Sequence, residues 1–166
     1  MTFSECHLRA LPVCAPFYPA LLAAATVIFA DGAAAQMQLD ETCVEVEGSE
    51  TSCAHAVACI GDDLLLVGQA IGWDQGLLQG EMSSGTTCTG VWSNIENVAN
   101  FTCEDGMTGI VTYSFKDPDT NVAVGAGQTI VGLPINAWSG ADLAAYIAQT
   151  TGARELTCGA HSVTLN

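Results

Sequence analysis

The feature that most constrains the fold is an alternation of apolar and polar residues, which is densest between Phe101 and Ile130. Within it, Ile110-Val-Thr-Tyr-Ser-Phe115 is the longest alternating run, and the breaks between such runs hold Gly, Asp, Asn and Pro. A two-residue period with these breaks predicts half-buried β-strands joined by tight turns. Because the same pattern extends back to Ala54 and forward to Trp138, we expect a long antiparallel meander.

The charge of the chain excludes some classes of partner. The 18 acidic residues outnumber the 3 lysines and arginines, which gives a formal net charge of −15. Phosphate backbones and anionic membrane surfaces repel such a protein, so we expect neither nucleic-acid nor membrane binding from the mature chain. A hydrophobic share of 49% is sufficient for a buried core and argues against disorder.

The N-terminus has the pattern of a secretory signal. Arg9 precedes an apolar run from Pro16 to Ala30, and Ala33-Ala34-Ala35 supplies the small residues typical of a cleavage site. We predict a signal helix within residues 1–35, cleaved after Ala35, with a retained membrane anchor as the alternative. Residues 36–52 are then an acidic tether, and residues 53–166 form the folded domain. Export would be to the periplasm or the extracellular medium.

Cleavage after Ala35 leaves an even number of cysteines. An even count in an exported chain predicts a disulfide framework, although six cysteines allow 15 connectivities and the sequence does not select one. No Cys-x-x-Cys pair occurs, so a thioredoxin-like redox role is unsupported, and the spacing does not match structural zinc sites. The six are Cys43, Cys53, Cys59, Cys88, Cys103 and Cys158.

The expected fold class is mainly β. The strands are short and the turns frequent, which favours a small sandwich or a partly closed barrel of about eight to ten strands. Glycines recur every four residues from Gly68 to Gly80, but four of them would destabilise a helix, so we interpret this stretch as two strands and a turn. Ser139–Gly152 has the start and stop signals of one C-terminal amphipathic helix, with Ser139 as its cap.

Acidic residues and histidines provide candidates for chemistry, each with a simpler interpretation. Asp117, Asp119 and Asn121 match the first ligand positions of a calcium loop, but Val122 replaces the required Gly, so a hairpin turn is preferred. The pairs Asp62-Asp63 and Glu104-Asp105, together with Asp74, fall at predicted turns, where Asp bonds the local backbone. His55 and His161 lie in no catalytic or metal motif. We predict no cofactor and no metal.

Three tryptophans are candidates for an aromatic binding face such as sugar-binding β domains use. Trp73, Trp92 and Trp138 are spread over the predicted strands, and packing in the core or at its rim is the alternative for each. A glycan is therefore one candidate partner.

A short part of the chain resembles the lysozyme-inhibitor β-barrels of bacterial envelopes. Phe101-Thr-Cys-Glu-Asp-Gly106 precedes an alternating strand, and Thr151-Gly-Ala-Arg154 is similar to the loop that enters the lysozyme cleft in that family. Glu155 stands where the family has tyrosine. The resemblance covers about ten residues and implies a basic hydrolase as partner.

We therefore expect an exported, acidic, disulfide-bonded β-domain that binds a partner or serves the cell envelope without catalysing a reaction. No nucleophile, zinc-protease or phosphate-loop motif occurs, which leaves the enzyme question open but leaning against catalysis. The alternatives are an inhibitor of a basic secreted hydrolase such as lysozyme and a small hydrolase that uses Asp and His residues.

Overall fold

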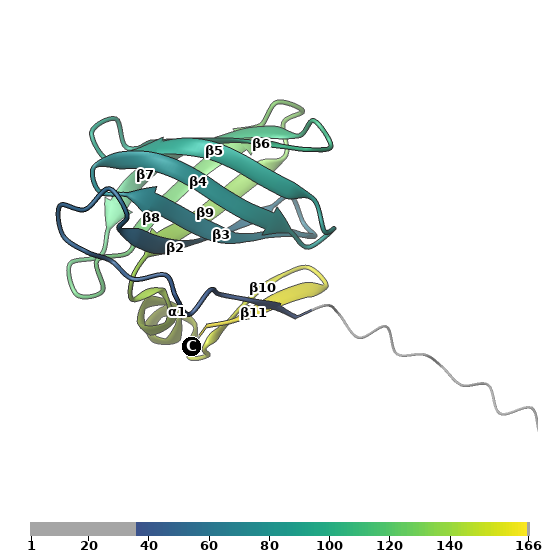
Figure 1. The fold of residues 1–166 in the computed structure, drawn as a ribbon. Helices are drawn as coiled ribbons and strands as arrows, with labels where there is room; N and C mark the ends of the chain where they lie inside the picture. Colours follow the sequence, from purple (N-terminus) through teal and green to yellow (C-terminus); the bar gives the residue numbers. More distant parts are fainter. Residues whose placement is uncertain (1–35, 166) are drawn as a thin grey trace, which may run out of the picture. The chain divides into compact units, whose positions relative to one another are not determined.

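The computed structural model describes residues 36–165, so the predicted signal helix and its cleavage site lie outside the described residues. Eight antiparallel strands form one sheet that closes on itself, because the last strand pairs with the first (Figure 1). The mainly β prediction is confirmed, and the sandwich or partly closed barrel is corrected to a closed barrel. The strands are β2 (Cys53–Ile60), β3 (Leu64–Gly72), β4 (Gln75–Met82), β5 (Thr87–Ser93), β6 (Val98–Cys103), β7 (Thr108–Lys116), β8 (Ala123–Thr129) and β9 (Pro134–Gly140).

Glycines let the first strands of the barrel bend past each other. Gly68 on β3 lies opposite Gly80 on β4, and Gly72 lies opposite Gly76. A Cβ atom on Gly68 would approach the Cα of Gly80 to 2.7 Å, which a side chain does not tolerate. The four-residue glycine spacing therefore marks facing positions on two paired strands, and the predicted arrangement of two strands and a turn is confirmed.

Large side chains fill one end of the barrel interior. Phe101 is 3% exposed and lies over Gly109, where an added Cβ would meet its ring at 2.5 Å. The disulfide between Cys88 and Cys103 joins directly opposite residues of β5 and β6 in the same cluster. This end, which we call the closed end, is filled further by Ile60, Leu66, Met82 and Ile135.

A second core covers the outer face of β2 and β3. Val57, Leu65 and Val67 point outward and pack against α1 (Leu143–Thr151) and a small sheet. That sheet has the order β1 (Met37–Gln38), β11 (His161–Thr164), β10 (Glu155–Cys158). Since both faces of β2 and β3 are buried, these strands lack the full alternation of polarity that the central hairpins show.

The helix starts later than its sequence signals indicate. Ser139 and Gly140 complete β9, and the N-cap position is Asp142, whose side chain makes no capping hydrogen bond. The prediction that Ser139 caps the helix is therefore wrong, because pairing with β2 and β8 extends β9 through these residues. Gly152 ends the helix in a left-handed conformation, as predicted.

Three disulfides confirm the predicted disulfide bonding. Cys43 pairs with Cys53 and Cys59 with Cys158, in addition to the bridge inside the barrel. Such bonds persist in an extracellular or otherwise oxidising compartment. Within residues 36–165, no helix has both the length and the apolar character needed to cross a membrane.

The bridge between Cys59 and Cys158 is predicted to contribute most to stability. It closes a loop of sequence separation 99, against 15 for Cys88–Cys103, and it fixes the small sheet to the barrel. Loop-closure entropy gives about 4.7 kcal/mol for a loop near 100 residues and about 3 kcal/mol for one near 15. We expect the double variant Cys59→Ala/Cys158→Ala to lose more unfolding free energy in urea than Cys88→Ala/Cys103→Ala. A smaller loss in the first variant would contradict this assignment.

Candidate functional site

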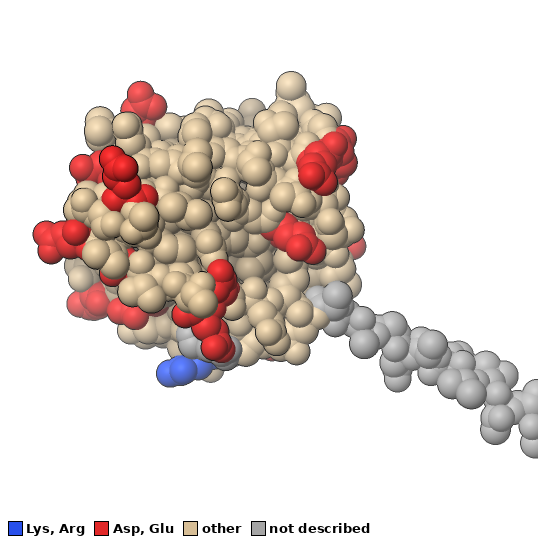
Figure 2. Space-filling model, in the orientation of Figure 1, with Lys and Arg blue, Asp and Glu red and all other residues tan. Residues whose placement is uncertain are grey.

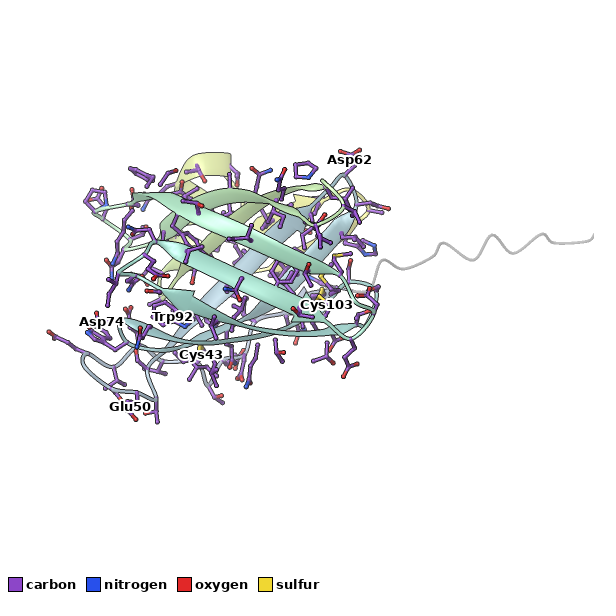
Figure 3. All side chains as sticks on the ribbon, turned by 90° about the horizontal axis from the view of Figure 1, so that it is seen from above. Cys43, Glu50, Asp62, Asp74, Trp92 and Cys103 are labelled. Carbon is purple, nitrogen blue, oxygen red and sulfur yellow. A yellow bond between two sulfur atoms is a disulfide. The ribbon has the colours of Figure 1, made fainter. Side chains whose placement is uncertain are left out.

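A pocket opens at the end of the barrel opposite the closed end; we call it the mouth pocket. It is formed where β2, β4, β6 and β8 begin and where β3, β5, β7 and β9 end. Figure 3 shows Trp92 and Asp74 at this end and Cys103 and Asp62 at the other. Its lining includes Glu45, Ser52, Ala54, Ala70, Gly72, Trp73, Leu78, Trp92, Asn94, Ala99, Tyr113, Lys116, Asn121, Ala123, Ser139 and Gly140.

The pocket exists because interior side chains become small toward the mouth. Along β2 the inward residues are Ala54, Ala56 and Ala58 before Ile60 at the closed end, and β3 presents Ala70 and Gly72. The cavity volume is about 70 Å³, and the whole recess, including space open to solvent, is about 660 Å³. Since one ordered water needs about 10–15 Å³ of such space, the cavity has room for roughly five waters or one ring-sized group.

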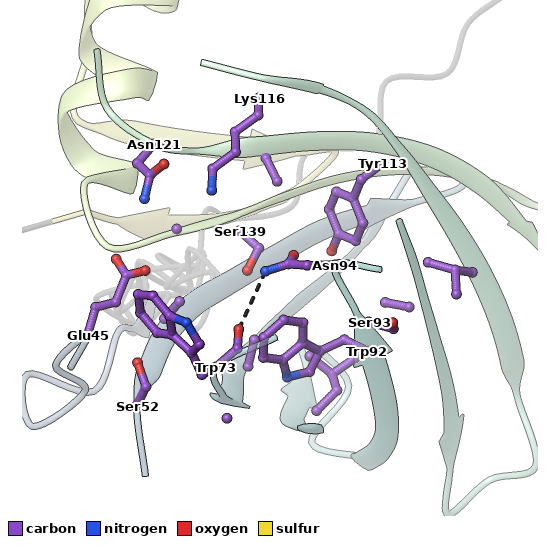
Figure 4. Close-up of a pocket in the computed structure, with 18 residues that line it drawn as sticks. Glu45, Ser52, Trp73, Trp92, Ser93, Asn94, Tyr113, Lys116, Asn121 and Ser139 are labelled. Carbon is purple, nitrogen blue, oxygen red and sulfur yellow. Dashed lines mark hydrogen bonds between the residues drawn. The ribbon is translucent and has the colours of Figure 1, made fainter. Parts of the chain in front are cut away.

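Two aromatic residues project into the pocket from the barrel wall. Trp92 is the penultimate residue of β5, and its indole Nε1 donates a hydrogen bond to the carbonyl of Ile71 at 3.2 Å. That bond leaves the indole ring as an apolar surface with no free donor. Tyr113 extends inward from β7 (Figure 4), and burial raises its pKa to about 12. The Tyr113 hydroxyl is therefore neutral and protonated at physiological pH.

Hydrogen bonds between neighbouring loops position Trp73. It lies in the turn between β3 and β4, and its carbonyl accepts a hydrogen bond from Asn94 Nδ2 at 3.4 Å (Figure 4). The backbone N–H of Asn94 donates to the carbonyl of Asp74 at 2.8 Å. These two bonds tie the β3–β4 turn to the β5–β6 loop, so the Trp73 side chain is presented at the pocket.

The three tryptophans of the predicted aromatic face do not lie together. Trp73 and Trp92 line the mouth pocket, whereas Trp138 lies on the outside of β9 in the second core. Tyr113, which the sequence did not single out, is the third aromatic residue of the pocket. The signal that identifies it is the inward register of β7, where Val111 and Tyr113 face the interior.

The segment expected to be a tether forms part of the pocket rim. Cys43–Cys53 closes a short loop, and within it Cys53 N–H donates to the carbonyl of Val44 at 3.0 Å. Val46 N–H donates to the hydroxyl of Ser52, also at 3.0 Å. Glu45 lies between these two bonded residues and lines the pocket.

The other candidate carboxylates lie in turns. Asp117 accepts hydrogen bonds from the backbone N–H and hydroxyl of Thr120, which lower its pKa, as in a simple Asp turn. Asp63 accepts from Ala160 N–H and Asp105 from Met107 N–H. Residues 36–165 contain no group of three or more His, Cys, Asp or Glu side chains arranged to hold a metal ion.

Neither predicted histidine lies at the pocket. His55 points outward from β2, and its Nε2 is 2.9 Å from the carbonyl oxygen of Asp40. The Asp40 carboxylate bonds Thr42 and Gln69, which lower its pKa. His161 has its Nδ1 buried without a hydrogen-bond partner in the described structure. No arrangement of nucleophile, base and carboxylate is formed by these residues in the described part of the chain.

Comparisons with known proteins add little to this description. The sequence matches no protein-family model, and no significant match occurs among curated proteins. One solved structure with some similarity is a de novo designed fluorescence-activating β-barrel, with 14% identity, a TM-score of 0.42, and coverage of 54% of this chain and 90% of that one. A TM-score this low supports no inference from that barrel to this protein.

The raised pKa of Tyr113 gives a prediction for alkaline pH. A phenol whose pKa rises from 10.0 to about 12 on folding stabilises the folded state fully below pH 10 and loses that contribution between pH 10 and 12. We expect ultraviolet titration to show a phenolate component near pH 12 that disappears in Tyr113→Phe. The wild type should also lose more stability than this variant over the same interval. A tyrosine component that ionises entirely near pH 10 would contradict the assignment.

Proposed function

We propose that this protein is an exported, non-catalytic binding protein that holds one small organic molecule in the mouth pocket. The observation that carries the proposal is the change in interior side chains along the barrel. Bulky residues such as Phe101 and Met82 fill the closed end, while Ala, Gly and Ser line the mouth beside aromatic rings. Eight-stranded barrels have an interior just wide enough for side chains or for one small ligand, so shortening the side chains at one end makes space for a ligand.

The chemistry of the lining supports this use. Small-molecule sites are concave and mostly apolar, with a few polar groups that fix orientation. Here the apolar part is supplied by Leu78, Ala99 and the two tryptophans, and the polar groups include the hydroxyls of Tyr113 and Ser139. A ligand would place a ring-sized group in the cavity and extend toward the rim loops.

The proposed site of action follows from the sequence and the disulfides together. The signal-like pattern before Ala35 supports export, and three disulfides fit an oxidising compartment. We therefore place the protein in the periplasm or outside the cell, with cleavage after Ala35.

Dye binding tests the proposal. N-phenyl-1-naphthylamine is uncharged and becomes fluorescent in apolar surroundings, so we expect one dye per protein with increased emission. Ala123 lines the pocket and Ala126 is exposed on the outside of the same strand, which provides a matched pair of substitutions. Ala123→Phe should weaken binding by at least about tenfold, equivalent to about 1.4 kcal/mol, whereas Ala126→Phe should not.

Equal binding by the two variants would overturn the proposal. The dye would then occupy another apolar surface, such as the shallow groove on the outside of β4 and β5 that includes Leu77, Val91 and Ile95. Circular dichroism of both variants establishes that the barrel is folded.

The acidic surface favours a second candidate, inhibition of a basic hydrolase. Acidic residues occur in each of the loops that surround the mouth, and Figure 2 shows several of them along the left edge, where these loops lie in Figure 1. Opposite charges accelerate and orient association between proteins. The loop residues are Glu45, Glu47, Glu50, Asp74, Glu96, Asp117, Asp119 and Asp142.

Lysozyme provides the test of this second candidate. An inhibitor should lower the rate of cell-wall hydrolysis at a protein ratio near one to one, and the effect should weaken with salt because screening reduces the attraction. A basic protein without hydrolase activity, added in excess, serves as competitor for purely electrostatic binding. Unchanged lysozyme activity at low ionic strength would exclude lysozyme as the target.

A further inference from the structure

We infer that the ligand of the mouth pocket is an organic cation, an apolar or aromatic body that carries a protonated amine or quaternary ammonium group. This inference rests on the proposed function, because it names the chemical class of the molecule that the pocket holds. It draws on three observations: the electrostatics of the rim, one carboxylate carried into the pocket by a constrained loop, and the aromatic walls.

The rim is negatively charged on all sides of the opening. The loop after Cys43, the β3–β4 turn, the β5–β6 loop, the β7–β8 turn and the β9–α1 connection each carry at least one carboxylate. Charges of one sign around a recess with low-dielectric walls raise the local concentration of oppositely charged solutes. Lys116 is the single basic residue among those that line the described pocket, and it is exposed at the end of β7 beside Asp117.

One carboxylate is part of the pocket itself. Glu45 lines the recess, and the hydrogen bonds of its two neighbours, Val44 and Val46, fix the backbone on either side of it. The Cys43–Cys53 disulfide closes the same loop, so the backbone that carries this carboxylate is more constrained than that of an open surface loop. Glu45 is exposed to solvent. It therefore remains available to an ammonium group.

The walls present three aromatic faces to a cation, and their donors are Lys116, the amides of Asn94 and Asn121, and hydroxyls such as that of Ser139. Trp92 Nε1 already donates to Ile71, so the indole donor is not free to bind a carboxylate or phosphate, whereas Asn94 Nδ2 uses only one of its two N–H groups on the Trp73 carbonyl. The Tyr113 hydroxyl is neutral, and the faces of Trp73, Trp92 and Tyr113 attract cations through their ring quadrupoles. In Figure 4, Glu45 lies on the same side of the view as Trp73, with Tyr113 on the other side.

A series of three naphthalene derivatives of similar size compares ligands of different charge. 1-Naphthylmethylamine is cationic at neutral pH, 1-naphthalenemethanol is neutral, and 1-naphthoate is anionic. Isothermal titration calorimetry should show that the amine binds at least about tenfold more tightly than the alcohol, and that naphthoate binds more weakly than either. Raising the ionic strength from about 0.01 M to about 0.15 M should reduce the advantage of the amine, because the Debye length falls from about 30 Å to about 8 Å.

Charge-neutralising variants identify the group responsible. Glu45→Gln should lower the affinity for the amine by about 3- to 10-fold without changing that for the alcohol, in the range expected when one close attraction is lost. Glu104→Gln, which removes a carboxylate at the closed end, is the matched control and should change neither affinity. Lys116→Gln should strengthen amine binding.

The outcomes separate this inference from the proposed function. Equal affinities for the amine and the alcohol, both lost in Ala123→Phe, would overturn the inference and leave the small-molecule function in place. Tighter binding of naphthoate would also overturn it and would assign the selectivity to Lys116. Absence of binding by all three molecules and by N-phenyl-1-naphthylamine would overturn both.

Discussion

The pairing of β9 with β2 is the interaction on which the rest of the structure depends. Residues 55–60 of β2 lie opposite residues 135–140 of β9, and this register joins the two ends of the eight-stranded sheet. Closure gives every barrel strand two neighbours, so the barrel has no edge strand. Closure also encloses an interior, and in this protein side chains fill that interior at one end and leave a pocket at the other.

The first two barrel strands have a double role because each has buried residues on both faces. On β2, Ala56 and Ala58 face the interior while Val57 faces the second core, and Cys59 connects the same strand to the small sheet. At the start of the same strand the inward residue is Ala54, which leaves space at the mouth, and the outward Val57 packs in the core that holds the helix. The binding site and the attachment of the helix are thus encoded by alternate positions of one strand.

The sequence predicted what depends on local periodicity. Alternation around Ile110 and Val111, the even number of cysteines, and the apolar pair Leu143 and Ile147 correctly indicated strands, disulfides and the C-terminal helix. Closure was not predictable in the same way, since strands of a sandwich and of a barrel share the period of two. Ser139 was misassigned because a residue that favours a helix cap is equally acceptable at the end of a strand whose partners are distant in sequence.

The pocket was the least visible feature of the sequence. It is lined by residues such as Ala54, Ala70 and Ala99, whose short side chains leave space in the barrel interior. An alanine within a predicted strand does not indicate a pocket, because the same residue also occurs in packed cores. The three tryptophans were predicted as candidates for one binding face. Only the register of the barrel strands shows that Trp92 faces the interior and Trp138 faces the outside. Glu45 was missed because an acidic segment before the first barrel strand resembles a solvated linker.

Parallel pairing of β1 with β11 has a consequence for the connectivity of the fold. Met37 lies opposite Val163, so the first and last described strands are adjacent on the outer side of the barrel. Because the two strands are parallel, a linker from the end of β11 must run back along the two-residue β1 to reach its start, and new chain ends could be placed in a closed-end turn such as residues 83–86 to make a circular permutant. The order of the strands along the chain is therefore separable from the closed sheet that they form, and neither end of the described chain, Gln36 or Leu165, lines the mouth pocket.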